Sequence, residues 1–257
     1  MSTEHIGEEG FRWFIGVVED REDPLKQGRV RARAFSIHGT AVEIPTNAIP
    51  WATVLMPGYS SSYKQVGTSP TGLQLGSTVI GFFMDGNEAQ LPIIIGIMPG
   101  NNDISKLAIG QNTLNKQQVG PEPESAYKTK YPYNKVFQSE SGHVIEIDDT
   151  PNFERTHTYH KSGTYTEINN QGRRVNKIVG DDFEVILKNK TLYVQGNLNI
   201  EVKGSASITA SSTSIKGNVT IDGNLTVNGN VKGGSSGISL TTHTHPETGT
   251  KTGPPSA

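Results

Sequence analysis

The residues Gly217 to Lys232 read GNVTIDGNLTVNGNVK, and their alternation decides the fold of the C-terminal half of this chain. The odd positions are apolar or glycine: Gly217, Val219, Ile221, Gly223, Leu225, Val227, Gly229 and Val231. The even positions are polar: Asn218, Thr220, Asp222, Asn224, Thr226, Asn228, Asn230 and Lys232. A period of two is typical of a β-strand. One chain cannot bury so narrow an apolar edge by itself, so we expect several identical chains to wind around a common axis.

The same alternation extends upstream with the opposite phase. Even positions are apolar or small from Leu192 to Ala210, and the phase changes after the serine-rich residues 211–214. A slip of one residue turns a strand over, which predicts a turn or bulge there. The glycines at 217, 223 and 229 recur every six residues, too short a repeat for a single-chain solenoid. Three chains, each forming one side of a triangular prism, fit this repeat. A two-sided sheet in a sandwich is the alternative.

His243 and His245 are the candidate metal ligands of this chain. In an extended strand, side chains two residues apart point the same way. Three copies would therefore direct six imidazoles at the common axis, an arrangement that suits an octahedral transition metal. Imidazole binds iron, nickel, copper or zinc, whereas structural zinc prefers four ligands. A metal whose coordination positions are all occupied by protein ligands has none left for a substrate, so such a site would be structural. The alternative is a flexible tail with two incidental histidines.

Composition narrows the functional classes. The chain has 257 residues, of which 33% are hydrophobic, with 29 glycines, no cysteine and a formal net charge of −2. Few apolar residues and many glycines favour a β-rich or fibrous chain. The charge gives no general attraction to nucleic acid, and the lack of cysteine excludes disulfides and thiolate sites. We expect no signal peptide, and no apolar run approaches the roughly 20 residues of a membrane-spanning helix.

Five regions are predicted along the chain: an N-terminal arm (1–10), a barrel (11–100), a linker (101–134), a needle (135–234) and an apex tip (235–257). The barrel prediction rests on five short β-type runs separated by glycine, proline and aspartate, at residues 13–19, 28–35, 51–56, 78–84 and 92–97. Such a series is typical of a small barrel or sandwich. The linker is polar and is expected to lie over a neighbouring surface.

Several charged residues have competing interpretations. Glu146, Asp148 and Asp149 could form an acid–base pair, but aspartates before Thr-Pro more often make turns, so we favour a turn. His157 and His160 are three apart, which places them on opposite faces of a strand, and both are predicted to be exterior.

The barrel contributes two further predictions. Arg29, Arg31 and Arg33 lie on one side of a predicted strand, where docking to a partner protein is favoured and a solvated face is the alternative. Phe35 is the only aromatic residue in that strand, which argues against binding of single-stranded nucleic acid. The aromatic residues Trp13, Trp51, Phe82 and Phe83 are predicted to lie in the core.

Three segments resemble the central spike proteins of contractile phage tail baseplates, the T4-like spike family, and the related spikes of type VI secretion. The first is similar to the N-terminal oligosaccharide/oligonucleotide-binding (OB) barrel, through residues 16–31 (GVVEDREDPLKQGRVR), Ile44-Pro-Thr, Pro50-Trp51 and residues 81–86 (GFFMDG). Residues 141–155 (SGHVIEIDDTPNFER) resemble the entry into the β-helix, and residues 242–246 (THTHP) with Gly253-Pro-Pro resemble the apex.

The resemblance implies an all-β protein, with an N-terminal OB-type barrel followed by an intertwined trimeric β-helix needle and a metal-bound apex. It implies one iron ion per trimer, held by His243 and His245 of three chains. The expected partners are two further copies, a baseplate hub protein and, transiently, the host outer membrane. The expected location is the tail baseplate tip of the virion, and the expected function is puncture of that membrane on sheath contraction.

No enzymatic activity is expected, because the lysozyme domain of the T4 spike has no counterpart in the linker, which is shorter than the roughly 50 residues of a small domain. The alternatives are a baseplate cell-wall hydrolase, a receptor-binding tail fibre and a type VI secretion spike.

Overall fold

The computed structural model describes residue 7 and residues 10–99, 122–234, 238–239 and 249. Its regular structure is nearly all β, with two short 3-10 turns at Thr46–Ala48 and Gly86–Glu88. No helix among these residues has the length and apolarity that crossing a bilayer requires. The contacts divide the chain into two units, with the boundary between Ile186 and Leu187.

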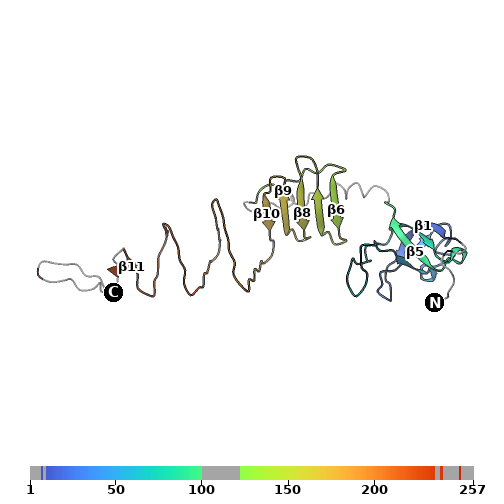
Figure 1. The fold of residues 1–257 in the computed structure, drawn as a ribbon, viewed down its shortest axis with the longest axis horizontal. Coiled ribbons are helices and arrows are strands. Elements are labelled where there is room, and N and C mark those ends of the chain that lie inside the picture. The colour runs from blue at the N-terminus through green and yellow to red at the C-terminus, as the bar shows by residue number, and fades with distance from the viewer. Residues whose placement is uncertain (1–6, 8–9, 100–121, 235–237, 240–248, 250–257) are drawn as a thin grey trace. The chain divides into compact units, whose positions relative to one another are not determined.

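The first five strands close into a barrel (Figure 1). They are β1 (Arg12–Asp20), β2 (Val30–Ala34), β3 (Trp51–Val54), β4 (Thr78–Phe83) and β5 (Pro92–Ile97). Their order around the barrel is β1-β2-β3-β5-β4, in which β3 and β5 run parallel and all other neighbours run antiparallel. This arrangement confirms the predicted N-terminal barrel, and all five predicted runs became strands.

Alternation within the strands builds the barrel core. In β2, for example, Val30, Ala32 and Ala34 are buried. The core cluster consists of Phe14, Val18, Val30, Ala32, Ala34, Ala52, Leu73, Val79, Phe83, Ala89 and Ile94. Gly81 of β4 permits a close approach at a bulge, because a Cβ there would lie 2.1 Å from the carbonyl oxygen of Ile93.

Five further strands form a separate antiparallel sheet in simple sequential order. They are β6 (Asn134–Gln138), β7 (Val144–Asp148), β8 (Arg155–Tyr159), β9 (Tyr165–Asn169) and β10 (Arg174–Lys177). Figure 1 shows them side by side as a single layer. Alternate residues therefore point to two different faces, and the two faces have different chemistry.

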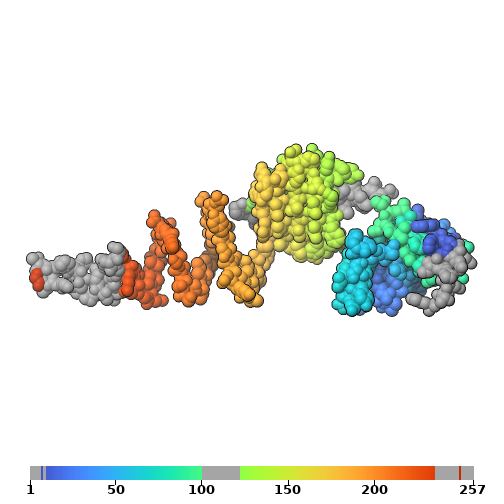
Figure 2. Space-filling model, in the orientation of Figure 1, coloured from blue at the N-terminus to red at the C-terminus, as the bar shows by residue number. Residues whose placement is uncertain are grey.

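The chain from residue 178 to residue 231 contains no assigned strand, and every residue from 178 to 234 is exposed. The short strands β11 (Lys232–Gly233) and β12 (Ile238–Ser239) pair with each other beyond it. Figures 1 and 2 show this stretch as a thin chain running back and forth in open loops. In the single chain, the alternating residues therefore pair with no other strand and are not buried.

Candidate interaction surfaces and a buried ionic cluster

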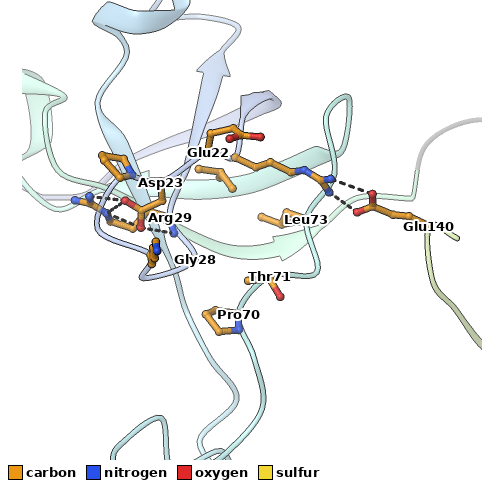
Figure 3. Close-up of a pocket in the computed structure, with 12 residues that line it drawn as sticks. Glu22, Asp23, Gly28, Arg29, Pro70, Thr71, Leu73 and Glu140 are labelled. Atoms are coloured by element: carbon orange, nitrogen blue, oxygen red, sulfur yellow. Dashed lines mark hydrogen bonds and ion pairs between the residues drawn. The ribbon is translucent and has the colours of Figure 1, made fainter. Parts of the chain in front are cut away.

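Arg29 is bound to its own β1–β2 loop. Its Nη2 donates to Asp23 Oδ1 at 2.7 Å, and Asp23 also accepts from the backbone N–H groups of Leu25, Gln27 and Arg29. Figure 3 shows the hydrogen-bonded pair of Asp23 and Arg29 among the residues that line a pocket. The hydrogen bond from Arg29, together with these backbone donors, holds the pKa of Asp23 far below its usual range. Arg29 therefore stabilises a loop.

Arg31 and Arg33 are engaged in the same way. Arg31 Nη1 donates to the carbonyl oxygens of Asn47 and, at 2.8 Å, Ile49, and its guanidinium lies 4.5 Å from the Trp51 ring centroid. Arg33 forms a two-pronged ion pair with Glu19, at 2.7 and 2.9 Å. Hydrogen bonding from Arg33 lowers the pKa of Glu19.

The arginine strand therefore does not present three free guanidinium groups, and docking through this side stays a prediction. All three guanidinium groups satisfy carboxylates and carbonyls of their own barrel, and Arg33 is buried. Sequence spacing identified the shared side of the strand, but it could not reveal that Glu19 at the end of β1 would pair with Arg33, or that the segment at 46–49 would turn its carbonyl groups toward Arg31.

The outer face of β1 and β4 carries an aromatic cluster instead. Trp13 is 57% exposed, and its ring lies 5.3 Å from that of Phe82, which also contacts Phe11 at 4.7 Å. Beside it is a groove of about 560 Å³, lined by Trp13, Phe14, Ile15, Phe35, Ser36 and Ile80. The prediction of a core position is confirmed for Phe83, which is fully buried, and wrong for Trp13.

The sheet β6–β10 has one open apolar face. Phe137, Ile145 and Ile147 are 68, 53 and 51% exposed. The register places Phe137 opposite Ile145, and Lys135 opposite Ile147, on the same side. Ile168 of β9 lies opposite Thr156 on that side. Exposed contiguous apolar side chains of this kind mark a surface that another molecule covers.

The opposite face of the sheet buries a cluster of charged residues. Arg155 Nη2 donates to Glu146 Oε2 at 2.7 Å, and its Nη1 donates to Glu167 Oε2 at 3.3 Å. His157 Nδ1 lies 3.0 Å from the same Glu146 oxygen, and Asn134 Nδ2 donates to Glu146 Oε1 at 3.3 Å. Glu146, Arg155, His157 and Glu167 are each at most 3% exposed.

Cross-strand register explains this clustering. Glu146, His157 and Glu167 occupy one row across three strands, and Asp148 and Arg155 are opposite each other in the next row. Burial alone would raise the pKa of Glu146. The hydrogen bond from His157 and the charge of Arg155 outweigh it, so the pKa lies below its usual value.

This cluster corrects the prediction for His157 and decides between the acid–base and turn interpretations of the carboxylates. His157 was predicted to be exterior, but it is buried, because residues 122–130 cover its face of the sheet; His160, on the other face, is exposed. Glu146 and Asp148 act structurally: Glu146 is ion-paired with Arg155, and Asp148 Oδ1 accepts from Thr150 N at 3.0 Å in a turn. The turn interpretation of Asp148 is therefore confirmed. The sequence signal that could have located the cluster is the alternation of charged and apolar residues in β7.

The two predicted metal ligands, His243 and His245, lie outside the described residues. Among the residues that the structure describes, no group of three or more histidine, aspartate or glutamate side chains is arranged to hold a metal ion. The metal site therefore stays a prediction from sequence.

Comparison with known proteins identifies relatives of both parts of the chain. Residues 34–112 match the family described as the Gp5 N-terminal OB domain. The chain is 32% identical over 277 aligned residues to protein Gp5 of Vibrio phage KVP40, covering 79% of this chain and 66% of that protein. It is 46% identical over 79 residues to the pre-baseplate central spike protein Gp5 of Enterobacteria phage T4.

The coverage of these relatives is incomplete. This chain spans just under two thirds of the Vibrio phage protein, and the aligned part amounts to 14% of the T4 protein. The alignment with the Vibrio phage protein is much longer than the barrel, so the likeness extends into the β-rich region that follows it.

Proposed function

We propose, from the premise that this chain belongs to the Gp5 family of phage baseplate central spike proteins, that three copies form a spike that punctures the host outer membrane. In this proposal the three sheets and the alternating segments after them assemble around one axis. The barrels attach the spike to a hub protein of the tail baseplate. Contraction of the tail sheath drives the spike forward along its axis.

One observation carries the trimer proposal. Every residue from 178 to 234 is exposed in the single chain. Yet every second residue in 192–210 and in 217–231 is apolar or glycine, as expected of a strand with one buried edge. The apolar face of β6–β10, with Phe137, Ile145 and Ile147, is likewise exposed to solvent in the single chain. Further copies of the same chain would bury both apolar surfaces, because each copy would supply an identical apolar side to a shared interior.

The barrel supports attachment to a hub. The aromatic cluster of Phe11, Trp13 and Phe82 and the groove beside it form an apolar surface on the outer side of β1 and β4. Aromatic residues are enriched at protein–protein interfaces, where they contribute a large share of the binding energy. A hub protein that presents apolar side chains is the partner this surface fits.

The tip proposal concerns His243 and His245. Two imidazole donors from each of three chains suit a metal with six ligands, and iron is the metal that likeness to the family suggests. Such a site would have no open position for a substrate. Its contribution would be to hold three chain ends together, since metal binding is coupled to folding when the ligands converge only in the folded state.

The proposed action is mechanical and involves no covalent chemistry. The only carboxylates considered as an acid–base pair, those of Glu146, Asp148 and Asp149, are used in ion pairs and turns. A spike of paired strands leaves few free edges, and it is suited to carrying force along its length.

Mass determination of the full chain tests the proposal. Light scattering over a hundredfold dilution series should give three times the mass of one chain, 27.8 kDa, at every concentration. Circular dichroism on the same samples should report β-structure throughout. A monomer that keeps a cooperatively unfolding needle segment at high dilution would contradict the proposal.

A further inference from the structure

Residues 122–130, which we call the strap, lie on the charged face of the sheet and are held there mainly by polar contacts. At its centre, the strap contacts Glu167 of β9. Ser125 Oγ donates to Glu167 Oε2 at 2.8 Å, and the backbone N–H of Ala126 donates to Glu167 Oε1 at 3.1 Å. Both oxygens of this carboxylate therefore accept hydrogen bonds from the strap.

A second attachment lies at the end of β7. Thr129 Oγ1 donates to Asp148 Oδ2, and the backbone N–H of Lys130 donates to Thr150 Oγ1 at 3.0 Å. Thr150 in turn donates from its own hydroxyl to Asp148 Oδ1 at 2.6 Å. Asp148 thus accepts hydrogen bonds on both oxygens, one directly from the strap and one from a threonine that itself binds the strap.

Further contacts include two between a cation and a ring, an ion pair and a hydrogen bond. The guanidinium of Arg155 lies 5.1 Å from the Tyr127 ring centroid, Lys177 Nζ lies 2.8 Å from Glu122 Oε1, and Lys128 Nζ lies 5.0 Å from the Phe153 ring centroid. Arg173 Nη2 donates to the carbonyl oxygen of Glu124 at 3.1 Å.

The strap and the sheet are thus stabilised by different forces. Neighbouring sheet strands are joined by continuous backbone ladders. No residue of the strap is assigned to a strand, so its attachment depends on side chains. A carboxamide in place of either carboxylate would turn an NH2 group toward one of these donors, and an NH2 group cannot accept a hydrogen bond. Hydrogen bonds to a carboxylate are also stronger than those between neutral groups.

We propose that the strap is a releasable latch, held closed by its hydrogen bonds to the carboxylates of Glu167 and Asp148, which opens while the sheet stays intact. Release of nine extended residues would free up to about 30 Å of chain between the barrel and the sheet. This part of the inference rests on the proposed function. In a spike, the released length of chain would let the needle advance while the barrels stay attached to the hub.

Charge-neutral variants of the full chain test the latch at neutral pH. In Glu167→Gln and Asp148→Asn, hydrogen exchange measured by mass spectrometry should be at least tenfold faster in peptides covering the strap. Exchange in peptides from β7 and β8 should stay close to that of the unaltered chain. Trypsin cleavage after Lys128 should accelerate in parallel, because the exposed lysine becomes part of a mobile backbone.

A matched control and a gentler variant complete the test. Glu154→Gln removes an exposed carboxylate that contacts only the N–H of Asn152 among the described residues, and it should leave strap exchange unchanged. Ser125→Ala removes a strap donor without altering the sheet, and it should raise strap exchange severalfold.

Two outcomes would overturn the latch. The first is strap exchange that is unchanged in all three strap variants. The second is equal acceleration in the strap and in β7–β9, including in Ser125→Ala, which would make the two a single cooperative unit. The mass of each variant is measured in the same samples. A chain that is monomeric throughout would contradict the proposed trimer, whereas the exchange rates would still test the latch.

Discussion

At the scale of single residues, Gly28 closes the loop that holds Asp23 against Arg29, and its backbone cannot accept a side chain. Its φ is +74°, and a Cβ would lie 2.4 Å from Pro70 Cγ. The left-handed conformation costs a residue with a side chain roughly 1–2 kcal/mol even without a clash. The contact with Pro70 adds to this cost because the proline ring is stiff.

Gly28→Ala should therefore destabilise the barrel by at least about 1–2 kcal/mol. Thermal unfolding of the full chain, followed by tryptophan fluorescence, measures the effect. Gly58→Ala is the matched control, since Gly58 has open space around its Cα and no positive φ. Equal unfolding temperatures for the two variants would contradict the role assigned to Gly28.

Glu146 gives the sheet a dependence on pH whose sign follows from its surroundings. Its folded pKa lies below the ordinary value of 4.5, because His157 and Arg155 favour the ionised form more than burial disfavours it. The stabilisation is therefore complete above about pH 4.5 and is lost as the pH falls through the lower folded value.

We expect the unfolding temperature of the sheet to decrease below pH 4.5. Glu146→Gln should lower that temperature at pH 7, because it leaves Arg155 and His157 without their shared carboxylate, and it should flatten the acid limb. Melting curves between pH 3 and pH 8 test both parts. An acid limb that is identical in the variant would assign the pH dependence to other groups.

At the scale of elements, the sequence predicted the five barrel strands and the β-character of residues 134–177, whereas the strands expected from 178 to 231 stay a prediction. Each of these signals is local: alternation, β-branched residues and turn formers. The placements that the sequence did not predict depended on distant segments. His157 is buried by residues 122–130, Arg33 is paired with Glu19 of β1, and Arg31 donates to carbonyl groups of the segment 46–49. Alternation gives two faces, but not which face another segment covers.

The open apolar face of β6–β10 leads to a prediction about assembly. Ile145→Asp places a charge at the centre of the apolar face, and it should shift the protein from trimer toward monomer in light scattering, because a buried unpaired charge is costly. Val42→Asp is the control, since Val42 is 95% exposed on a barrel loop. A fully trimeric Ile145→Asp protein would mean that this face is not the shared interior.

At the scale of the whole molecule, the metal prediction concerns the C-terminal tip. Elemental analysis of purified protein should find one metal atom per three chains, and His243→Ala with His245→Ala should abolish it. Chelation should loosen the chain ends and lower the unfolding temperature, while the mass stays that of three chains. The variant His160→Ala, at an exposed histidine, should keep the metal, which separates tip ligands from histidines in general.

The closed order of the barrel has a consequence for assembly. Each of its five strands has a hydrogen-bonded neighbour on both sides. If three copies assemble as proposed, their barrels come close together, and none of them presents an unpaired backbone edge on which a strand of another chain could nucleate. Crowding at the base of the assembly therefore favours recognition through side chains over fibre-like growth between barrels.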